Sequence, residues 1–515
     1  MREIQTEEFG RILVRQIPFP EGVIPDFVHY TWSGRVACSY RREGDPEGYL
    51  RIMTLNDDGT DVNEIWAGDF KHGKSNGFRY MPFKDNKRAY IGDYILECTP
   101  DCDHTEKAEL IPIHYPDKIT KSKGRWMIWS ENVVAPDNEH IAWSTLGLKG
   151  GVYIAKLRRT EANYELDDLR CVSTVNAYKK DPKHRGCVIE EPARGGEVKQ
   201  FVRGGRGLSY VGMGRGAGNS MLQALDSEEV VELNKTPCYD ETTILSPDEK
   251  LGITMSTRFS KKTGCGIIGL IPRRGNMMTK SSMVMNVYLY AVAGARAFRE
   301  GANVGPALVT MERSVSDMKY TGVDLHDPGE EWIYYSPMSW HPSGKKVMWN
   351  ERLRKDLGDR ARVSIAELLD YVPGDPVENA GVPENIPYAK PGVQSMSLVP
   401  KGKAKQAGLY SGKVITKSTL LRKPKLVTTV YENFSDDGKT FINGFEKAET
   451  PGLLSVGNTV YDADITVTGE HTGEMKVHLV FERSGREDPV RIGKESEGYA
   501  EYDGERISVS DMDFN

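Results

Sequence analysis

Ionisable side chains recur four to six residues before a short turn motif in this sequence. His29 stands before one such turn, and Glu131 and Glu241 stand before two others. Carboxylates and an imidazole held close together can move protons or hold a divalent metal ion as a Lewis acid. We therefore predict catalytic roles for the ionisable residues that share this position: His29, Tyr80, Glu131, Glu241, Tyr431 and Glu432.

A second set of side chains could bind a substrate beside these groups. Four come from the same position before a turn and two from loops: Arg79, Lys199, Gln200, Tyr335, His184 and His326. His29, Glu131 and Glu241 could instead form a mixed metal centre, so one divalent metal ion is an open alternative. No nucleotide cofactor is expected, because the Gly-rich segment 212–218 lies between two strand patterns, whereas a phosphate loop leads from a strand into a helix.

The turn motif that spaces these residues is repeated. Its clearest copies are Val133-Val-Ala-Pro-Asp-Asn, Ile244-Leu-Ser-Pro-Asp-Glu and Ser339-Trp-His-Pro-Ser-Gly. In each copy an apolar stretch leads into the turn, and an alternating apolar strand follows it. Pro fixes φ at the first turn position, and Asp, Asn or Gly accept the next one. Each copy therefore predicts a hairpin of two strands.

Weaker copies extend the motif over most of the chain. With them, the turns fall near residues 33, 84, 136, 203, 247, 342 and 436. Spacings of roughly 40–50 residues suit four-stranded propeller blades, and longer ones require insertions. We predict an all-β, seven-bladed β-propeller, with six or eight blades as alternatives. It would form a single domain over residues 1–515, with repeats at about 25–485 and insertions near 170–198, 258–330 and 372–425.

The repeat resembles that of TolB-like propellers, a group related to WD40 repeats that also forms the N-terminal propeller of prolyl oligopeptidase-type enzymes. The resemblance implies that the strand before each turn is the innermost of its blade, so that the residues named above meet around a central channel. Some propeller lyases with this architecture, such as oligogalacturonate lyase, hold a metal with several inner-strand histidines, and this sequence lacks such a set. The resemblance is specific for fold and not for function.

Composition and charge exclude several classes of protein. The net charge of −6 gives no general electrostatic reason to bind nucleic acid or an anionic membrane. No apolar run reaches the roughly 18 residues of a membrane span, and the N-terminus lacks the apolar core of a secretory signal. The seven Cys are scattered and odd in number, which predicts reduced thiols and a cytoplasmic location. Cys98-Thr-Pro-Asp-Cys-Asp-His104 resembles half a metal site, with a polar loop as the alternative.

Two functions remain open from the sequence. The first is an enzyme, a lyase, isomerase or hydrolase, that acts on a small polar or aromatic molecule at the channel mouth by acid–base or metal-assisted chemistry. The second is a non-catalytic propeller that binds a peptide or protein partner on its top face. A prolyl oligopeptidase-type hydrolase is excluded, because the repeats leave no room for a domain with a Gly-x-Ser-x-Gly nucleophile. The oligomeric state stays open.

Overall fold

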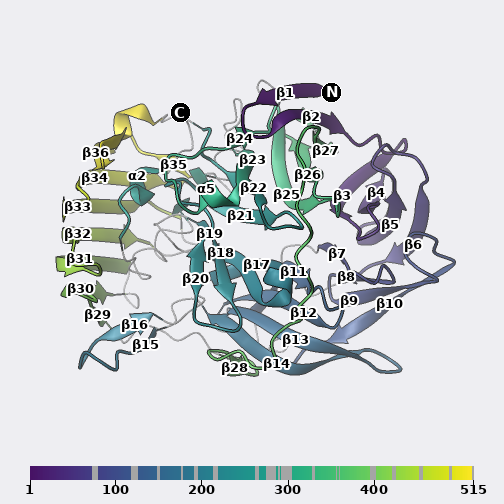
Figure 1. Cartoon of the computed structure of the whole chain (residues 1–515), viewed down its shortest axis with the longest axis horizontal. Helices are drawn as coiled ribbons and strands as arrows, with labels where there is room; N and C mark the ends of the chain where they lie inside the picture. Colours follow the sequence, from purple (N-terminus) through teal and green to yellow (C-terminus); the bar gives the residue numbers. More distant parts are fainter. Residues whose placement is uncertain are drawn as a thin grey trace.

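Six groups of antiparallel strands follow one another through the first 368 residues of the computed structural model (Figure 1). The structure describes the chain except residues 72–78, 118–125, 148–150, 175–177, 191–194, 213–217, 261–265, 274–285, 288–289, 292–303, 328–330, 355–356, 359, 395–401, 420–424, 452–455, 486–489 and 513–515. The expected insertions at 170–198, 258–330 and 372–425 therefore lie partly outside the described residues.

Each group of strands pairs as one blade. Blade 1 comprises β3 (Val23–Tyr30), β4 (Val36–Arg42), β5 (Tyr49–Leu55) and β6 (Asn63–Asp69). Blade 2 comprises β7 (Tyr80–Pro82), β8 (Arg88–Ile91), β9 (Tyr94–Thr99) and β10 (Lys107–His114). Blade 3 comprises β11 (Trp126–Val134), β12 (His140–Gly147), β13 (Gly151–Arg159) and β14 (Tyr164–Thr174).

The second half of the ring repeats the arrangement. Blade 4 comprises β17 (Gly195–Val202), β18 (Gly207–Gly212), β19 (Asn219–Ala224) and β20 (Val230–Glu232). Blade 5 comprises β21 (Asp240–Leu245), β22 (Leu251–Ser256), β23 (Gly305–Thr310) and β24 (Val323–Asp324). Blade 6 comprises β25 (Trp332–Trp340), β26 (Lys346–Leu353) and β27 (Ala361–Leu368), completed by β2 (Gly10–Gln16) and β1 (Arg2–Thr6) from the N-terminus.

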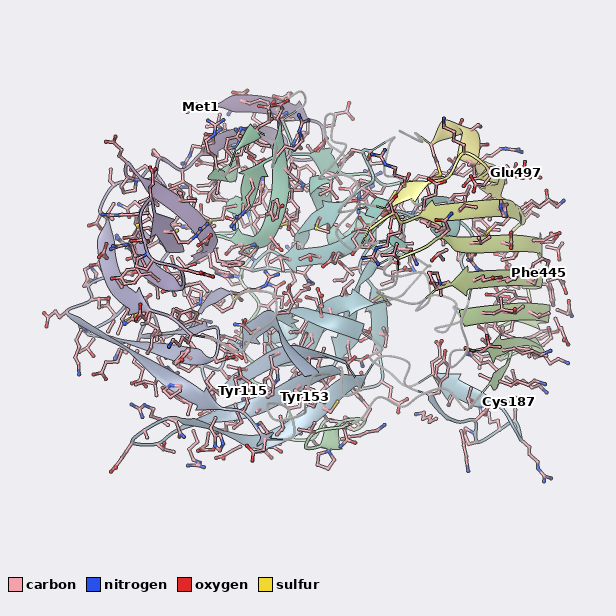
Figure 2. The ribbon with its side chains drawn as sticks, turned by 180° about the vertical axis from the view of Figure 1, so that it is seen from behind. Met1, Tyr115, Tyr153, Cys187, Phe445 and Glu497 are labelled. Carbon is pink, nitrogen blue, oxygen red and sulfur yellow. A yellow bond between two sulfur atoms is a disulfide. The ribbon has the colours of Figure 1, made fainter. Side chains whose placement is uncertain are left out.

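The first strands of the six blades form a closed ring. β3 contacts β7, and the contacts continue through β11, β17, β21 and β25 back to β3 (Figure 1). The two ends of the ring join within blade 6, where β2 pairs with β27 and Ile12 faces Leu368. Apolar side chains fill the spaces between blades, as Tyr115 and Tyr153 do on blades 2 and 3 (Figure 2). The predicted β-propeller is therefore confirmed, with six blades among the described strands.

Six of the seven predicted turns connect the first and second strands of a blade. The left-handed backbone that such turns need is supplied by Asn86 (φ 56°), Asn138 (φ 62°) and Gly344 (φ 70°), among others. The weakest copy of the motif, near Arg203, is a true turn between β17 and β18, with a short 3-10 helix η1 (Arg203–Gly205).

The seventh predicted turn belongs to a different sheet. It joins β31 and β32 in a C-terminal sheet of nine strands: β29 (Lys403–Ala407), β30 (Ser411–Ser418), β31 (Lys425–Ser435), β32 (Thr440–Thr450), β33 (Thr459–Gly469), β34 (Gly473–Glu482), β35 (Arg491–Ile492), β36 (Glu497–Tyr502) and β37 (Glu505–Ser508). A 3-10 helix η4 (Val509–Asp511) follows. This turn therefore adds no seventh blade to the ring of the described strands, which fits the alternative of six blades. Asp437 accepts backbone N–H groups here as it would in any antiparallel hairpin.

The C-terminal sheet shares a core with the ring. One cluster of buried apolar side chains runs from Ile253 and Trp349 in blades 5 and 6, through Ile271, to Tyr461 and Leu479 in the sheet. Ile271 follows the short helix α2 (Gly266–Gly269), which lies in the insertion between β22 and β23. The apolar core is thus continuous between the ring and the C-terminal sheet. The expectation of one domain over residues 1–515 stays a prediction.

Two smaller elements lie beside the strands of the six blades. A hairpin of β15 (Tyr178–Lys180) and β16 (Val188–Glu190) precedes blade 4 and contacts β29 of the C-terminal sheet. The helix α5 (Met311–Ser314) follows β23.

Two expectations drawn from composition have different outcomes. No helix among the described residues is long and apolar enough to cross a membrane. Cys98 and Cys102, by contrast, form a disulfide, so the prediction that all seven cysteines are reduced thiols is wrong for this pair. The segment from Cys98 to His104 is therefore a closed polar loop and not half of a metal site.

Residues 371–391, here called the strap, cross the turns of three blades on the way from β27 to β28 (Lys390–Pro391) (Figure 1). The backbone of the strap donates from Val377 to the carbonyl of Pro247 at 2.8 Å, at the turn of blade 5. It donates from Ala380 to the carbonyl of Gly204 at 2.9 Å, at the turn of blade 4. β28 finally pairs with β14 of blade 3. The strap thus covers the turn end of the ring over blades 3 to 5.

Gly204 lets the strap approach the turn of blade 4. Its φ is 63°, and a Cβ built there would lie 2.0 Å from the carbonyl oxygen of Glu378 in the strap. Since a backbone oxygen cannot yield at that distance, a side chain at this position must displace the strap.

We expect Gly204→Ala to release the strap without opening the ring, because the clash involves only the strap backbone. Limited proteolysis should then cleave within residues 371–391 faster than in the wild type. Gly186→Ala is the matched control, since Gly186 also has a positive φ (78°) but no atom within 4 Å of a built Cβ. Both variants carry a left-handed backbone cost of about 1–2 kcal/mol. Equal cleavage of the strap in the two variants would contradict this account of the contact.

Candidate functional site

Five ionisable side chains from four neighbouring blades meet at the centre of the ring. Arg79 precedes β7, Glu131 lies on β11, Glu197 and Lys199 lie on β17, and Glu241 lies on β21. We call these five residues the ion cluster. Their strands are the innermost of blades 2 to 5, so closure of the ring brings the side chains together.

Lys199 is the centre of the ion cluster. Its Nζ lies 2.9 Å from Oε2 of Glu197, 3.4 Å from Oε1 of Glu131 and 3.4 Å from Oε1 of Glu241. Nη2 of Arg79 lies 2.5 Å from the same Oε1 of Glu131. Glu131 is thus shared by both cations, while Glu197 and Glu241 each form an ion pair with Lys199.

The ion cluster contains three carboxylates and two cations. Although burial opposes it, the three glutamates raise the pKa of Lys199, so the ammonium stays charged. Burial likewise disfavours the charged form of Glu131, but Arg79 and Lys199 hold its pKa below the usual value. Two cations therefore balance two carboxylates, and the third carboxylate has no counter-ion of its own among the described residues.

Glu197 is the carboxyl group that takes up the imbalance. Burial raises its pKa to about 7, and the charges of Glu241 and Glu131 add to this rise while Lys199 opposes it. A carboxyl group with such a pKa is partly protonated at neutral pH. Its second oxygen, Oε1, makes no hydrogen bond within the described part of the chain.

The exposure of the ion cluster increases away from the turns. The side chains of Lys199 and Glu131 are 3% and 7% exposed, whereas those of Glu241 and Glu197 are 15% and 18% exposed. Glu197 and Glu241 each stand six residues before a turn, further from it than Lys199 or Glu131. Among the described residues, side-chain exposure in the ion cluster therefore rises towards the end of the ring opposite the turns and the strap, and we call this end the open end.

A tyrosine fixes the outer edge of the ion cluster. The hydroxyl of Tyr239 donates to Oε2 of Glu241 at 2.6 Å. Oε1 of Glu241 binds Lys199, so both of its oxygens are held in place. On the opposite side, Tyr334 of β25 is buried and lies close enough to Arg79 to contribute to the raised pKa of its guanidinium.

His29 stands beside the ion cluster as a neutral imidazole. Its Nδ1 lies 2.7 Å from the carbonyl oxygen of Tyr30 and 3.1 Å from Oγ of Ser339. Burial lowers the pKa of His29 to about 4, and the positive charge of Arg79 contributes to the fall. The carbonyl oxygen of Tyr30 can only accept a hydrogen bond, so Nδ1 carries the hydrogen and Nε2 presents a lone pair.

Three of the predicted site residues lie near the centre but have structural contacts. Tyr80 is fully buried in the apolar core between blades 1 and 2, where burial raises the pKa of its hydroxyl. Gln200 binds the backbone of Leu245 in the next blade through both its amide nitrogen (3.1 Å) and oxygen (2.8 Å). Tyr335 packs under the guanidinium of Arg352. The predicted catalytic role of Tyr80 and the predicted substrate-binding roles of Gln200 and Tyr335 stay untested.

The two loop histidines do not join the ion cluster. His184 is exposed on the β15–β16 hairpin and its Nδ1 lies 2.7 Å from Oδ2 of Asp181. Figure 2 shows Cys187 of this hairpin beside the C-terminal sheet, away from the middle of the ring. His326 is buried between blades 5 and 6, and its Nε2 lies 3.0 Å from the carbonyl oxygen of Trp332.

Tyr431 and Glu432 lie on β31, so their predicted place at the channel is wrong. Glu432 is exposed and pairs with Lys413 at 2.6 Å. The buried hydroxyl of Tyr431 donates to Oε1 of Glu446 at 2.7 Å. Glu446 also holds Nη2 of Arg273 at 2.9 Å, and this buried ion pair fastens the insertion after β22 to the C-terminal sheet.

The residues predicted to hold a metal do not fit one. His, Cys, Asp and Glu side chains do not gather in threes at metal-binding distances anywhere among the described residues. Glu131 is committed to Arg79 and Lys199, which occupy the side where a second cation would have to enter. We derive no metal-assisted step from this site.

Sequence reasoning found four members of the ion cluster and missed Glu197. The count backwards from the turn stopped at Lys199, two residues short of Glu197. Side chains alternate along a strand, so residue 197 points to the same side as residue 199. Tyr239 and Tyr334 were missed for the same reason, since both lie eight residues before a turn.

Comparisons with known proteins give distant likenesses to solved structures and no function. No family model and no curated protein matches the chain. A putative TolB from Agrobacterium tumefaciens is 12% identical with a TM-score of 0.34, over 65% of this chain and 94% of that one. TolB from Acinetobacter baumannii is 12% identical with a TM-score of 0.35, over 67% and 65%. An oligogalacturonate lyase in complex with manganese is 8% identical with a TM-score of 0.34, over 72% and 96%.

These scores are too low to carry an argument, so the propeller rests on the strand pairing and ring closure described above. The solved structures do include TolB proteins, the group whose repeat the sequence resembles.

Glu197 should make stability depend on pH. Its folded pKa of about 7 lies above the value of an unfolded glutamate, so the protonated form stabilises the fold and this contribution is lost as pH rises through 7. We expect the free energy of unfolding to fall by about 2–3 kcal/mol between pH 5 and 8, and Glu197→Gln to remove this loss. Urea unfolding at a series of pH values measures both. Glu432→Gln, an exposed change in the C-terminal sheet, should keep the wild-type slope; a slope unchanged in Glu197→Gln would refute the assignment.

Glu446 should show the opposite dependence. Although burial opposes it, Arg273 and two tyrosines lower the pKa of Glu446 to about 2, so its stabilisation is present above pH 4.5 and disappears towards pH 2. Glu446→Gln leaves the buried charge of Arg273 without its carboxylate and should cost about 3 kcal/mol or more at pH 7. Glu449→Gln, on the same strand but half exposed and 3.8 Å from Lys447, should cost less than about 1 kcal/mol in the same urea titration. Equal losses would mean that the buried pair does not fasten the insertion.

Proposed function

We propose that this chain is an enzyme that performs acid–base chemistry on a small polar molecule at the open end of the ring. Glu197 gives and takes the proton. The observation that carries the proposal is the imbalance of the ion cluster, in which three carboxylates share two buried cations. Lyases, isomerases and hydrolases all need a proton moved between a substrate atom and a protein group.

Glu197 suits this role in three respects. A general acid or base works best with a pKa near the working pH, and burial brings this carboxyl group there. Its side chain is the most exposed of the ion cluster, and its Oε1 makes no hydrogen bond within the described residues. Strongly shifted carboxyl groups of this kind are concentrated at functional sites, although structural ion networks shift pKa values as well.

The other members of the ion cluster would support the proton transfer. Lys199 is a fixed positive charge 2.9 Å from Glu197, so it stabilises the carboxylate that remains after a proton has left. Tyr239 and Lys199 hold Glu241 in one orientation beside it. A substrate entering from the open end meets the carboxyl groups of Glu197 and Glu241 before the buried cations. We therefore propose a substrate that presents hydroxyl or amino donors.

The alternative is a propeller that binds a peptide or protein partner without catalysis. On the turn end, the strap already forms hydrogen bonds with the turns of blades 4 and 5, so a partner there would have to displace it. This alternative therefore requires that the partner bind at the open end.

A ligand screen followed by product analysis separates the two functions. Sugars, polyols, amino acids and amines are screened by thermal shift at pH 7, and each hit is incubated with the protein and examined by mass spectrometry. We expect hits that the wild type converts, and conversion slower by about 10²–10⁴-fold in Glu197→Gln with binding retained. Glu449→Gln should behave as the wild type.

Two results would contradict the enzyme. Ligands that bind both wild type and Glu197→Gln but are always recovered unchanged would indicate a binding propeller. Hits whose thermal shift is the same in Glu197→Gln and Glu241→Gln as in the wild type would place the binding site elsewhere.

A further inference from the structure

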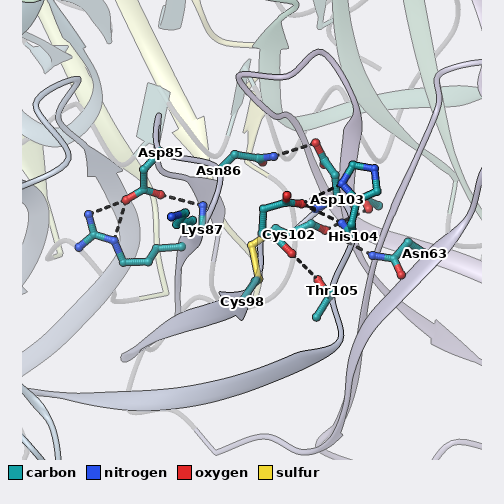
Figure 3. Close-up of a disulfide and its surroundings, with 12 residues drawn as sticks. Asn63, Asp85, Asn86, Lys87, Cys98, Cys102, Asp103, His104 and Thr105 are labelled. Atoms are coloured by element: carbon teal, nitrogen blue, oxygen red, sulfur yellow. Dashed lines mark hydrogen bonds and ion pairs between the residues drawn. A yellow bond between two sulfur atoms is a disulfide. The ribbon is translucent and has the colours of Figure 1, made fainter.

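The one disulfide among the described residues lies at the joint between blades 1 and 2. Cys98 is on β9, the third strand of blade 2, and Cys102 follows in the loop that leads to β10 (Figure 3). Both residues are buried, at 5% and 3% exposure. Cys38, Cys171, Cys187 and Cys238 form no disulfide, so disulfide pairing among the described residues is confined to this loop.

The loop closed by the disulfide is held by blade 1 as well as blade 2. The carbonyl oxygen of Cys102 accepts from Oγ1 of Thr54 at 3.3 Å and from Nδ2 of Asn63 at 3.5 Å, both in blade 1. The N–H of Cys102 donates to the carbonyl of Asn86 in blade 2 at 2.8 Å. The backbone of Cys102 therefore bridges the two blades.

Asp103 makes a second bridge at the same joint. Its Oδ2 accepts from Nδ2 of Asn86 in blade 2 at 2.7 Å (Figure 3). Its Oδ1 lies 3.5 Å from Nε of Arg35, in the turn of blade 1. The carboxylate is only 6% exposed, so its position depends on the loop keeping one shape.

We propose that Cys98 and Cys102 are a site of oxidative modification, and that closing this five-residue loop fixes the joint between blades 1 and 2. The two thiols lose two protons and two electrons to a partner disulfide, which is reduced to two thiols as the Cys98–Cys102 bond forms. The acceptor is thus of the thiol–disulfide exchange class.

The disulfide also bears on the cellular compartment in which the chain folds. Stable disulfides are rare in compartments that keep thiols reduced and common in oxidising ones. The buried sulfurs of Cys98 and Cys102 are shielded once the ring has closed, so the bond has to form before or during folding. We infer an oxidising compartment, in place of the cytoplasmic location expected from the scattered cysteines.

Alkylation of the full chain tests the modification. The protein is produced in an oxidising compartment, unfolded in denaturant and treated with iodoacetamide without reductant. We expect the peptide with Cys98 and Cys102 to carry no alkyl group and to be two hydrogens lighter than its reduced form, while Cys38 is alkylated. A peptide that is alkylated at both positions would overturn the proposal.

Hydrogen exchange tests the role at the joint. The wild type is refolded from denaturant with and without a reductant, and both samples are compared with the double variant Cys98→Ser/Cys102→Ser. We expect reduction to speed exchange at least tenfold in residues 99–106 and also in the turn of blade 1 around Arg35, with blades 4 and 5 unchanged. Asp103→Asn should reproduce the effect around Arg35 with the disulfide intact. Faster exchange restricted to residues 99–106, or no change anywhere, would refute a role at the joint even if the disulfide is present.

Discussion

Closure of the ring is the constraint on which the rest of the structure depends. A blade of four short antiparallel strands has two faces to bury, and only neighbouring blades can cover them. The N-terminal strand β2 completes blade 6 by pairing with β27, which joins residues more than three hundred positions apart in the chain. Every inner strand is then directed at one axis, and side chains that are distant in sequence are forced into contact.

The ion cluster follows from this constraint. Arg79, Glu131, Lys199 and Glu241 would be ordinary surface charges on isolated hairpins, where their pairing would add little stability. At the axis they lose most of their water, so each charge needs a partner or a proton. Two cations satisfy two carboxylates, and the remaining group, Glu197, is held close to its protonation midpoint at neutral pH. Burial of these charges costs free energy of folding. The same burial raises the pKa of Glu197 to about 7, so this carboxyl group can exchange protons near neutral pH.

The sequence predicted the turns between strands well, but it did not predict how the ring closes. Six turns were identified because Pro, Asp, Asn and Gly fix turn geometry without help from the rest of the fold. The turn at Asp437 obeys the same chemistry, and nothing local tells whether a hairpin joins the ring or another sheet. β2 lies before the first repeat, and its pairing depends on the completed ring.

The residues of the candidate site were likewise predicted only in part. Counting back from the turns found the members of the ion cluster nearest to them, because the ring aligns its inner strands in register. Glu197 needed the strand alternation to be followed one step further. Tyr80 and Gln200 stand at the correct sequence positions, yet they pack into a core and bind a neighbouring backbone, which only the assembled blades decide.

The central claim is that Glu197 carries a proton at the axis of the ring at neutral pH. The most direct measurement is the carboxyl ¹³C chemical shift of Glu197, followed as a function of pH by NMR and assigned by comparison with Glu197→Gln. The account predicts a titration midpoint at about 7. A midpoint at the ordinary glutamate value of about 4.3 would show that the ion cluster is balanced without a proton, and would contradict the account.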